Sequence, residues 1–306
     1  MAKHSPARRR FDRLVGYRLE TAAVSLFTGL LRNLPLDRAS ALGGKLAGAI
    51  GPRLAASRKA ARNLSRALPE LDEATRARVL AEAWENFGRT MAEYVHLPTL
   101  KTEWKGRVEM VGEEYLAALA QDGRPGIAVT GHFGNWELAA LACALQGLEL
   151  TFVFREPNNP HVAKRLADAR SVLGGDMVPK GKAAAKGLIV AMRKGGHVGL
   201  LVDQKLNEGI SIPFLGQEAM TGTVMADLAL RFEAPVVPIR VTRLRDASGR
   251  FTARFRVQAF PPLEFRRTGD APADTEATMR QVNDLLGDWV RDDPGQWLWQ
   301  HRRWKD

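Results

Sequence analysis

The chain has 306 residues, of which 45% are hydrophobic and 26% are charged. This balance excludes an intrinsically disordered chain and is enough for one large domain or two small ones. The formal net charge of +11 favours anionic partners such as nucleic acid, anionic lipid or a phosphorylated substrate. The single cysteine, Cys143, excludes an internal disulfide and lies in an apolar helical pattern, where it fits as a small core residue.

The N-terminal stretch is basic and then apolar. Six basic residues come first, and the uncharged run Thr21 to Leu31 follows. This run is shorter than the ~20 apolar residues that a membrane-spanning helix needs, and no clean cleavage site marks a signal peptide. A basic flank beside a short apolar helix suits a helix that lies on a membrane. A buried N-terminal helix behind solvated arginines explains the same pattern.

Residues 14 to 95 are predicted to be helical. Leu34-Pro35 ends the first helix, the segment Ala39 to Ile50 forms a second, and Asp72 is a candidate N-cap for a third. No linker separates two domains. We therefore expect a helical, membrane-associating N-terminal region over residues 1–100 that packs as one unit with an α/β domain over 101–306.

From residue 127 onward, short apolar runs alternate with helical patterns, which predicts an α/β fold with a mixed central sheet flanked by helices. Phe251 to Val257 alternates apolar and polar residues and predicts a half-exposed strand. A last amphipathic helix ends before Pro294-Gly295. The earlier predicted strands are 127–129, 150–154, 197–202 and 236–241, and the predicted helices between them are 136–146, 160–173, 183–194 and 221–232.

The stretch GHFGNWE, residues 131 to 137, follows the first of these strands. A turn through Gly131 to Gly134 and a helix beginning about Asn135 place His132 in the loop at the strand's carboxyl end. Glu137 falls in the first helical turn, from which its carboxylate can turn back toward His132. A carboxylate holds the tautomer of an imidazole and stabilises the imidazolium, so His132 is a candidate general base with Glu137 as its support.

This stretch contains no serine or cysteine, so the nucleophile would be a hydroxyl or amine of a substrate, and direct acyl transfer is the expected reaction. Glycines allow main-chain N–H groups to approach a reacting group, and a helix N-terminus favours nearby negative charge. On spacing alone, the pair also fits a structural loop histidine and an ordinary helix-terminal charge.

The same residues resemble a known signature. His132 and Glu137, separated by four residues, resemble the HX4E form of the glycerolipid and lysophospholipid acyltransferase superfamily motif. The form HFGNWE resembles the bacterial lipid A biosynthesis acyltransferases, the lauroyl and myristoyl transferases. Three further blocks resemble this family in the expected order: FVFREPNNP (152–160), LLVDQ (200–204) with SIPFLGQEAMTGT (211–223), and PGQWLWQHRRWK (294–305).

This resemblance implies an enzyme that moves a fatty acyl chain from acyl carrier protein, or from coenzyme A, to a hydroxyl of an anionic Kdo-lipid A precursor. His132 would take the proton from that hydroxyl, and Glu137 would orient the imidazole ring. The resemblance also implies catalysis without a metal or an organic cofactor. It further implies a protein anchored through its N-terminal helix to membrane lipid at the cytoplasmic face of the bacterial inner membrane.

Four further residues are candidates for substrate binding. Arg155 closes FVFR, where the superfamily places a phosphate-binding arginine, a task that the fixed fork of guanidinium donors suits. Arg170 matches an arginine of the lipid A branch. Solvated surface positions are the alternative for both. Asp203 and Gln204 end an apolar strand, where the site residues of a sheet gather, and turn chemistry is their alternative.

The aromatic C-terminal block has two interpretations. Trp297, Trp299 and Trp304 with their neighbouring arginines would suit a membrane interface, or they would pack a C-terminal turn against the core. We expect His301 to be structural, because one base is already placed. We expect no metal site, because the remaining candidate histidines, His4, His161 and His197, lack partners at metal-ligand spacing.

Three other functions are open on the sequence alone. One is another lipid acyltransferase, acting for example on a phosphatidylinositol mannoside or a lysophospholipid. Another is a basic nucleic-acid-binding protein, although the arginines are dispersed and no nucleic-acid-binding motif is present. The third is a membrane-surface scaffold without activity, against which the intact pair His132 and Glu137 argues.

Overall fold

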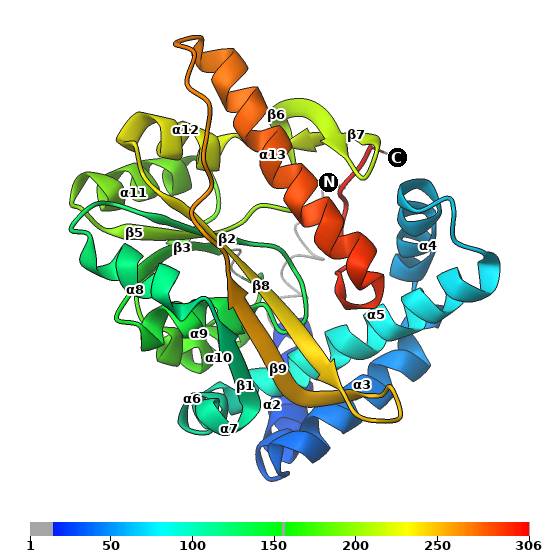
Figure 1. Ribbon diagram of the computed structural model, residues 1–306. Helices are drawn as coiled ribbons and strands as arrows, with labels where there is room; N and C mark the ends of the chain where they lie inside the picture. Colours follow the sequence, from blue (N-terminus) through cyan, green and yellow to red (C-terminus); the bar gives the residue numbers. More distant parts are fainter. Residues whose placement is uncertain (1–14, 155–156, 306) are drawn as a thin grey trace.

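The computed structural model describes residues 15–154 and 157–305 (Figure 1). The chain is helical up to the first strand, and Asp72 caps α5 by accepting a hydrogen bond from the main-chain N–H of Thr75 at 2.7 Å, as predicted. Within the described residues, no helix is both long and apolar enough to cross a membrane. The helices of this part are α2 (Tyr17–Arg32), α3 (Leu36–Ile50), η2 (Gly51–Arg53), α4 (Ala55–Ala67), α5 (Glu73–Glu93), η3 (Tyr94–His96), α6 (Leu97–Thr102) and α7 (Trp104–Arg107).

A seven-stranded sheet forms the centre of the molecule, in the order β1-β9-β8-β2-β5-β3-β4. All neighbouring strands run parallel except β8 and β9, which form an antiparallel hairpin. The sheet is therefore mixed, as predicted. Its strands are β1 (Val108–Val111), β2 (Ile127–Thr130), β3 (Leu150–Phe154), β4 (Asp176–Pro179), β5 (His197–Leu201), β8 (Val236–Arg245) and β9 (Phe251–Ala259).

Helices cover both faces of this sheet (Figure 1). Ile127 and Val129 of β2 are buried in one core with side chains of α11, α12 and α13, whereas Ala128 is buried in a second core with α8 and α9. Successive side chains of a strand point to opposite faces, so a continuous apolar run feeds both cores. The helices are α8 (Glu113–Gln121), α9 (Glu137–Leu145), α10 (Pro160–Arg170), η4 (Ser171–Leu173), α11 (Lys182–Arg193), α12 (Val224–Phe232) and α13 (Ala271–Asp292). The predicted α/β class is confirmed.

Several elements were not predicted, among them β1, α8 and β4, and two parts of the fold bear on the site. β6 (Lys205–Phe214) and β7 (Gln217–Thr221) form a separate antiparallel hairpin, which the sequence analysis did not predict. After α13, η5 (Pro294–Gln296) leads into a segment whose three tryptophans are buried at 2% exposure or less: Trp297, Trp299 and Trp304. Of the two interpretations of these tryptophans, packing against the core is the one that the structure shows.

Candidate active site

Strand register brings together two polar residues that lie far apart in the chain. β2 and β5 are parallel neighbours, and Thr130 at the end of β2 is paired with Leu201 at the end of β5. The main-chain N–H of Val202 then donates to the carbonyl of Thr130 at 3.0 Å, which extends the pairing by one step. His132 and Asp203 each lie two residues beyond these strand ends. The register therefore places them side by side at the carboxyl edge of the sheet, where α/β proteins carry their sites.

Asp203 holds His132 at two points. Its Oδ1 lies 2.8 Å from Nδ1 of the imidazole, and its Oδ2 accepts a hydrogen bond from the main-chain N–H of His132 at 2.8 Å. The indole Nε1 of Trp297 donates to the same Oδ2 at 2.9 Å. Both His132 and Asp203 are buried. The carboxylate thus fixes the ring, the main chain of the loop and the C-terminal segment together.

The charge state of Asp203 determines the tautomer of His132. Burial alone would raise the pKa of Asp203, but attraction to His132 and the hydrogen bonds from its ring and main chain outweigh burial, so the pKa lies below its ordinary value. An ionised carboxylate only accepts hydrogen bonds. In the neutral imidazole the proton therefore lies on Nδ1, and Nε2 carries the lone pair, with the amide nitrogen of Gln204 at 3.3 Å. In this tautomer Nε2 can accept a proton, as a general base does.

Glu137 does not hold the imidazole, which corrects the expectation that its carboxylate turns back toward His132. Its Oε2 accepts from Nε of Arg170 at 3.0 Å, and its Oε1 accepts from Tyr94, Arg170 and the indole of Trp136. α9 begins at Glu137 and not near Asn135. The ring of Trp136 contacts both groups, since it lies 5.0 Å from the ring of His132 and its indole nitrogen donates to Glu137 at 3.1 Å.

A cavity of about 910 Å³ opens beside the dyad. This volume lies within the range of small-molecule sites, roughly 300–1,000 Å³. Much of its wall is apolar, contributed by residues such as Phe152, Leu173 and Leu188, and the polar groups His132, Glu137, Arg170 and Gln204 also line it. The cavity therefore combines a base with space for an apolar ligand.

The candidate substrate-binding residues are placed as follows. Arg170, the last residue of α10, lines the cavity and pairs with Glu137, and Gln204 lines it with its Nε2 3.3 Å from Nε2 of His132. Asp203 is fully buried beneath the base and does not line the cavity wall. Arg155 lies outside the described residues, as does His4, and the basic residues before position 15 do also.

Two residues at the site were not singled out for it from the sequence. The hydroxyl of Tyr94 donates to Glu137 and accepts from Arg170 Nη2 at 2.9 Å; burial, with the nearby Glu137 charge, raises its pKa well above the ordinary value. Trp297, considered only for membrane contact or packing, donates to Asp203. For Tyr94, its place in a helical apolar pattern indicated only a core position. For Trp297, a signal was available, because it lies in the block PGQWLWQHRRWK (294–305) that resembles the family.

His301 lies nearer to the dyad than expected. Its ring centroid is 5.6 Å from that of His132, and both of its ring nitrogens are buried without a hydrogen-bond partner among the described residues. Ligand atoms of His132, Asp203 and His301 lie within 4.8 Å of one another. A metal bound by all three would compete with the hydrogen bond between His132 and Asp203, and the expectation of no metal stays a prediction.

The fold and the site together define an α/β protein with a histidine–carboxylate pair beside a largely apolar cavity, an arrangement that suits acyl transfer. The chain belongs to the family of bacterial lipid A biosynthesis acyltransferases, whose family model matches residues 11–306. The resemblance drawn from the sequence is therefore confirmed, and the protein is a lipid A-type acyltransferase.

Two named acyltransferases are similar to this chain in sequence. The lipid A biosynthesis lauroyltransferase of Escherichia coli (strain K12) is 26% identical over 257 residues, covering 80% of this chain and 77% of the relative. The phosphatidylinositol mannoside acyltransferase of Mycobacterium tuberculosis (strain CDC 1551 / Oshkosh) is 23% identical over 251 residues, covering 79% and 75%. The crystal structure of the 1-acyl-sn-glycerophosphate acyltransferase PlsC of Thermotoga maritima aligns over 88% of this chain and 97% of that one, with 14% identity and a TM-score of 0.36.

Proposed function

We propose that the protein transfers a fatty acyl chain from acyl carrier protein to a hydroxyl of a Kdo-bearing lipid A precursor. The observation that carries this proposal is the His132–Asp203 pair, which directs Nε2 of the imidazole toward a largely apolar cavity in a chain of the lipid A acyltransferase family. Acceptor, donor and mechanism are parts of the proposal.

In the proposed reaction, Nε2 of His132 removes the proton from the acceptor hydroxyl. The oxygen attacks the thioester carbonyl, a new C–O bond forms, and the C–S bond breaks. The proton then passes from the imidazolium to the leaving thiolate. Asp203 stabilises the imidazolium through Nδ1. The two substrates supply nucleophile and leaving group and the protein supplies the base, so the reaction uses no resident metal or organic cofactor.

Gln204 marks the place of the acceptor. Its side-chain amide lies 3.3 Å from Nε2 of His132, close to the ~2.6–3.2 Å at which a hydroxyl would lose its proton to that nitrogen. We propose that the acceptor hydroxyl takes this position and that the amide of Gln204 then contacts the substrate instead.

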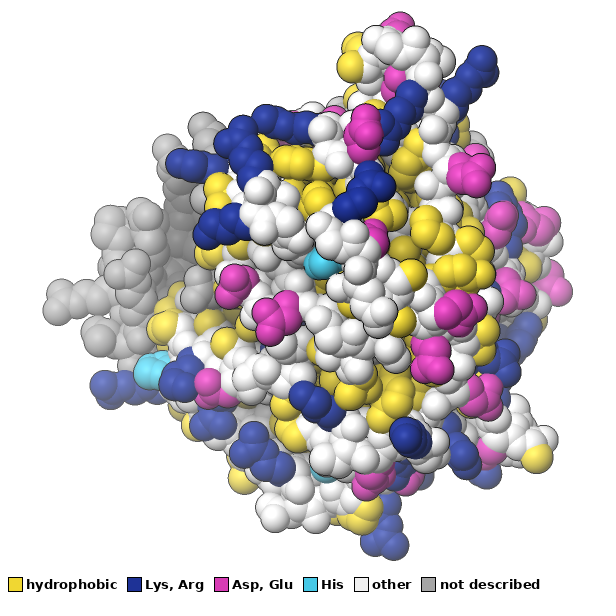
Figure 2. Space-filling model, turned by 60° about the vertical axis from the view of Figure 1, so that its left-hand side comes forward, with side chains coloured by type: hydrophobic (Ala, Val, Ile, Leu, Met, Phe, Trp, Pro, Cys, Tyr) yellow, Lys and Arg dark blue, Asp and Glu magenta, His cyan; other side chains and the backbone are white. Residues whose placement is uncertain are grey.

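Glu137 and Arg170 have a different task in this proposal. Glu137 holds the guanidinium of Arg170 at the cavity wall, and Lys180 and Lys205 line the same cavity. Cationic side chains at this wall suit the phosphate groups of an anionic glycolipid. Figure 2 shows Lys and Arg side chains gathered along the upper part of one face, around exposed hydrophobic side chains, which suits a substrate that is both anionic and apolar.

Membrane attachment through the N-terminal helix is supported by the surface of α2. Leu19, Leu26 and Leu30 are 67%, 79% and 53% exposed, which is unusual for leucine, and Arg18 and Arg32 lie near the two ends of the helix. Exposed leucines beside arginines suit the interface of an anionic membrane. We propose that this helix holds the protein at the cytoplasmic face of the bacterial inner membrane. Leu26→Glu should then weaken sedimentation with vesicles that contain phosphatidylglycerol, whereas unchanged sedimentation would exclude α2 as the anchor.

An acyl-transfer assay read by mass spectrometry tests the proposed function. The purified protein is mixed with a series of acyl-acyl carrier proteins and a Kdo-bearing lipid A precursor, and in parallel with acyl-coenzyme A and with a phosphatidylinositol mannoside. His132→Ala is the inactive variant. His161→Ala, which changes an exposed histidine of α10, is its matched control.

A mass gain of one acyl chain on the lipid A precursor, lost in His132→Ala and kept in His161→Ala, is the expected result. It would give the acceptor class, the donor and the chain length together. A gain on the mannoside alone would overturn the proposed acceptor and leave an acyltransferase of another glycolipid, the alternative that similarity to the mycobacterial relative supports. Full turnover by His132→Ala would overturn the mechanism.

A further inference from the structure

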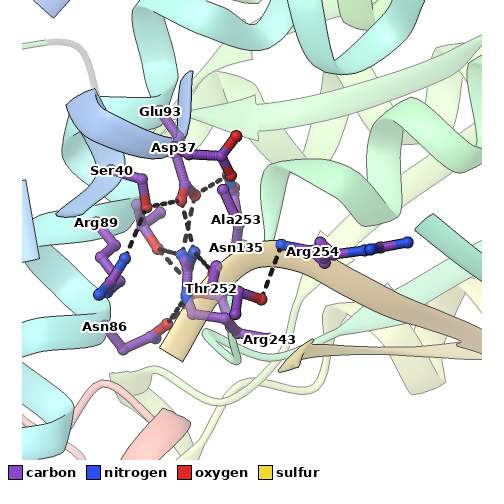
Figure 3. Close-up of polar contacts among 12 residues, drawn as sticks. Asp37, Ser40, Asn86, Arg89, Glu93, Asn135, Arg243, Thr252, Ala253 and Arg254 are labelled. Carbon is purple, nitrogen blue, oxygen red and sulfur yellow. Dashed lines mark hydrogen bonds and ion pairs between the residues drawn. The ribbon is translucent and has the colours of Figure 1, made fainter. Parts of the chain in front are cut away.

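A buried ion pair lies behind the catalytic loop, outside the cavity. Arg243 of β8 and Glu93, the last residue of α5, have side chains that are 0% exposed. Nη1 of Arg243 donates to Oε1 of Glu93 at 2.5 Å and Nη2 donates to Oε2 at 2.9 Å (Figure 3). Desolvating two charges costs about as much as their attraction returns, so overall stability alone does not account for such a pair. Its remaining contacts identify a more specific task.

Arg243 orients two neighbouring side chains of α5. Its Nε donates to Oδ1 of Asn86 at 2.8 Å, which turns the amide nitrogen of Asn86 in the opposite direction. Its Nη2 also donates to the hydroxyl oxygen of Thr90 at 3.2 Å, so the proton of that hydroxyl is free to point elsewhere. Both side chains are buried, and neither lines the cavity.

The oriented donors converge on the loop that carries His132. Nδ2 of Asn86 donates to the carbonyl of Gly134 at 3.1 Å, and Oγ1 of Thr90 donates to the same carbonyl at 3.0 Å. Oε2 of Glu93 accepts from Nδ2 of Asn135 at 2.9 Å. The loop is thus held two and three residues after His132 by groups that the ion pair orients.

The other side of Gly134 is fixed through the same arginine. The main-chain N–H of Gly134 donates to the carbonyl of Gln296 at 3.1 Å, and the side chain of Gln296 bonds both main-chain groups of Arg243, at 2.6 and 3.0 Å. Gly134 has φ +53°, and a Cβ there would lie 2.7 Å from the carbonyl oxygen of Val241. The loop therefore has one conformation, and its polar contacts lead back to Arg243.

We propose that Glu93 and Arg243, acting through Asn86 and Thr90, are positioning residues that keep His132 in register with Asp203 and with the reacting hydroxyl. The inference rests on the proposed role of His132 as the base. Catalytic groups must be held within about 0.5 Å, and a misplacement of 1 Å costs about 10²-fold in rate. Loss of the contacts to Gly134 should therefore lower kcat without weakening substrate binding, because none of the four residues lines the cavity.

The test compares two buried asparagines that lose similar contacts. Asn86→Ala removes one of the two side-chain donors to the carbonyl of Gly134 and leaves Thr90 as the other. Asn283→Ala is the matched control: Asn283 is 1% exposed, donates to the carbonyl of Pro213 at 2.8 Å and accepts from Arg303 at 3.0 Å, but contacts no residue of the loop. Thr90→Val, which removes only one hydroxyl donor, is a milder second variant that serves if Asn86→Ala does not fold.

Three quantities are measured for each variant: the melting temperature, kcat and KM for both substrates, and the low-field proton NMR signal of the His132–Asp203 hydrogen bond. That signal is assigned by its loss in Asp203→Asn. We expect Asn86→Ala to lower kcat about 10²-fold, with KM within about threefold and a broadened low-field signal. Asn283→Ala should lower the melting temperature similarly and keep both kcat and the signal.

The proposal is overturned if folded Asn86→Ala, or folded Thr90→Val in its absence, keeps kcat within threefold and the low-field signal unchanged. It is also overturned if Asn283→Ala loses as much activity as Asn86→Ala at an equal loss of melting temperature. If the wild-type protein transfers no acyl chain to any acceptor, the proposed function fails, whereas the NMR comparison still decides whether Asn86 positions His132.

Discussion

Asp203→Asn is the substitution whose effect the structure specifies most fully. The change keeps the shape of the side chain and replaces one oxygen by an NH2 group. Oδ2 of Asp203 accepts from two donors, the main-chain N–H of His132 and the indole of Trp297, whereas Oδ1 faces only Nδ1 of the imidazole. The amide oxygen of the variant side chain would remain with the two donors, because an NH2 group there would face both of them.

The NH2 group of the variant then points at Nδ1 of His132 and donates to it. Nδ1 must give up its proton, so the proton moves to Nε2, and the nitrogen that faces the cavity is no longer basic. Exchange of Asp for Asn beside a catalytic histidine costs about 10⁴-fold in kcat through this change of tautomer. That loss corresponds to ~5 kcal/mol of barrier height.

The assay is steady-state acyl transfer at saturating donor and acceptor, with circular dichroism to verify the fold. Asp292→Asn is the control: Asp292 is exposed and pairs with Arg240, away from the dyad, so this variant should retain full activity. If folded Asp203→Asn keeps more than about a tenth of wild-type kcat, the tautomer of His132 does not depend on Asp203, and the reasoning from the hydrogen bonds is refuted.

Three further predictions concern other groups. Glu137→Ala releases Arg170 and should lower kcat/KM by about 10²-fold in the same assay, and a loss equal to that of His132→Ala would show instead that Glu137 takes part in proton transfer. Burial lowers the pKa of His301 from 6.5 to about 4, with repulsion from His132 and Arg303 acting in the same direction and attraction to Asp203 opposing it. The folded protein therefore binds a proton on His301 less readily than the unfolded protein does. The free energy of unfolding should fall as pH drops from 6.5 to 4. Urea titrations over this pH range should show a smaller fall in His301→Phe than in the wild-type protein, and an equal fall would contradict the prediction. Burial raises the pKa of Cys143 to about 12, so maleimide should label the native protein at least ~10²-fold more slowly than the urea-unfolded protein, and equal rates would show that the thiol is accessible.

The elements around the base could be predicted from the sequence because their signals are local. An apolar run followed by a glycine-rich turn and an apolar helix predicts a strand, a loop and a helix, and the structure has β2, the His132 loop and α9 in this order. The alternation from Phe251 to Val257 likewise predicted β9, whose apolar side chains are buried and whose arginines at 254 and 256 are exposed.

The partner of His132 could not be predicted by proximity in the chain. Glu137 is five residues away and pairs with Arg170, whereas Asp203 is 71 residues away and binds the imidazole. The difference arises from the register between β2 and β5, which depends on both strands and on the helices packed against them. A partial signal was available, because His132 and Asp203 each follow a predicted strand and the carboxyl ends of parallel strands lie at one edge of a sheet. The equal offset of two residues depends on the strand ends seen in the structure, Thr130 and Leu201.

The Glu93–Arg243 network was beyond prediction for a similar reason. Its members lie on α5, β8 and the segment after α13, and each one alone reads as an ordinary charged or polar residue of a helix or strand. Burial of a charge is a property of the assembled layers, not of a sequence window.

The segment after α13 also has a consequence for synthesis of the chain, because it supplies hydrogen bonds to both members of the dyad. A nascent chain that ends within α13 already contains His132, Asp203 and the whole sheet. It lacks the indole of Trp297, which donates to Asp203, and the N–H of Leu298, which donates to the carbonyl of His132 at 3.2 Å. Domains assemble from their N-terminal side during synthesis. The residues that complete the dyad are therefore synthesised after both of its members, and a translation product that stops within α13 would lack two of the hydrogen bonds that hold the base.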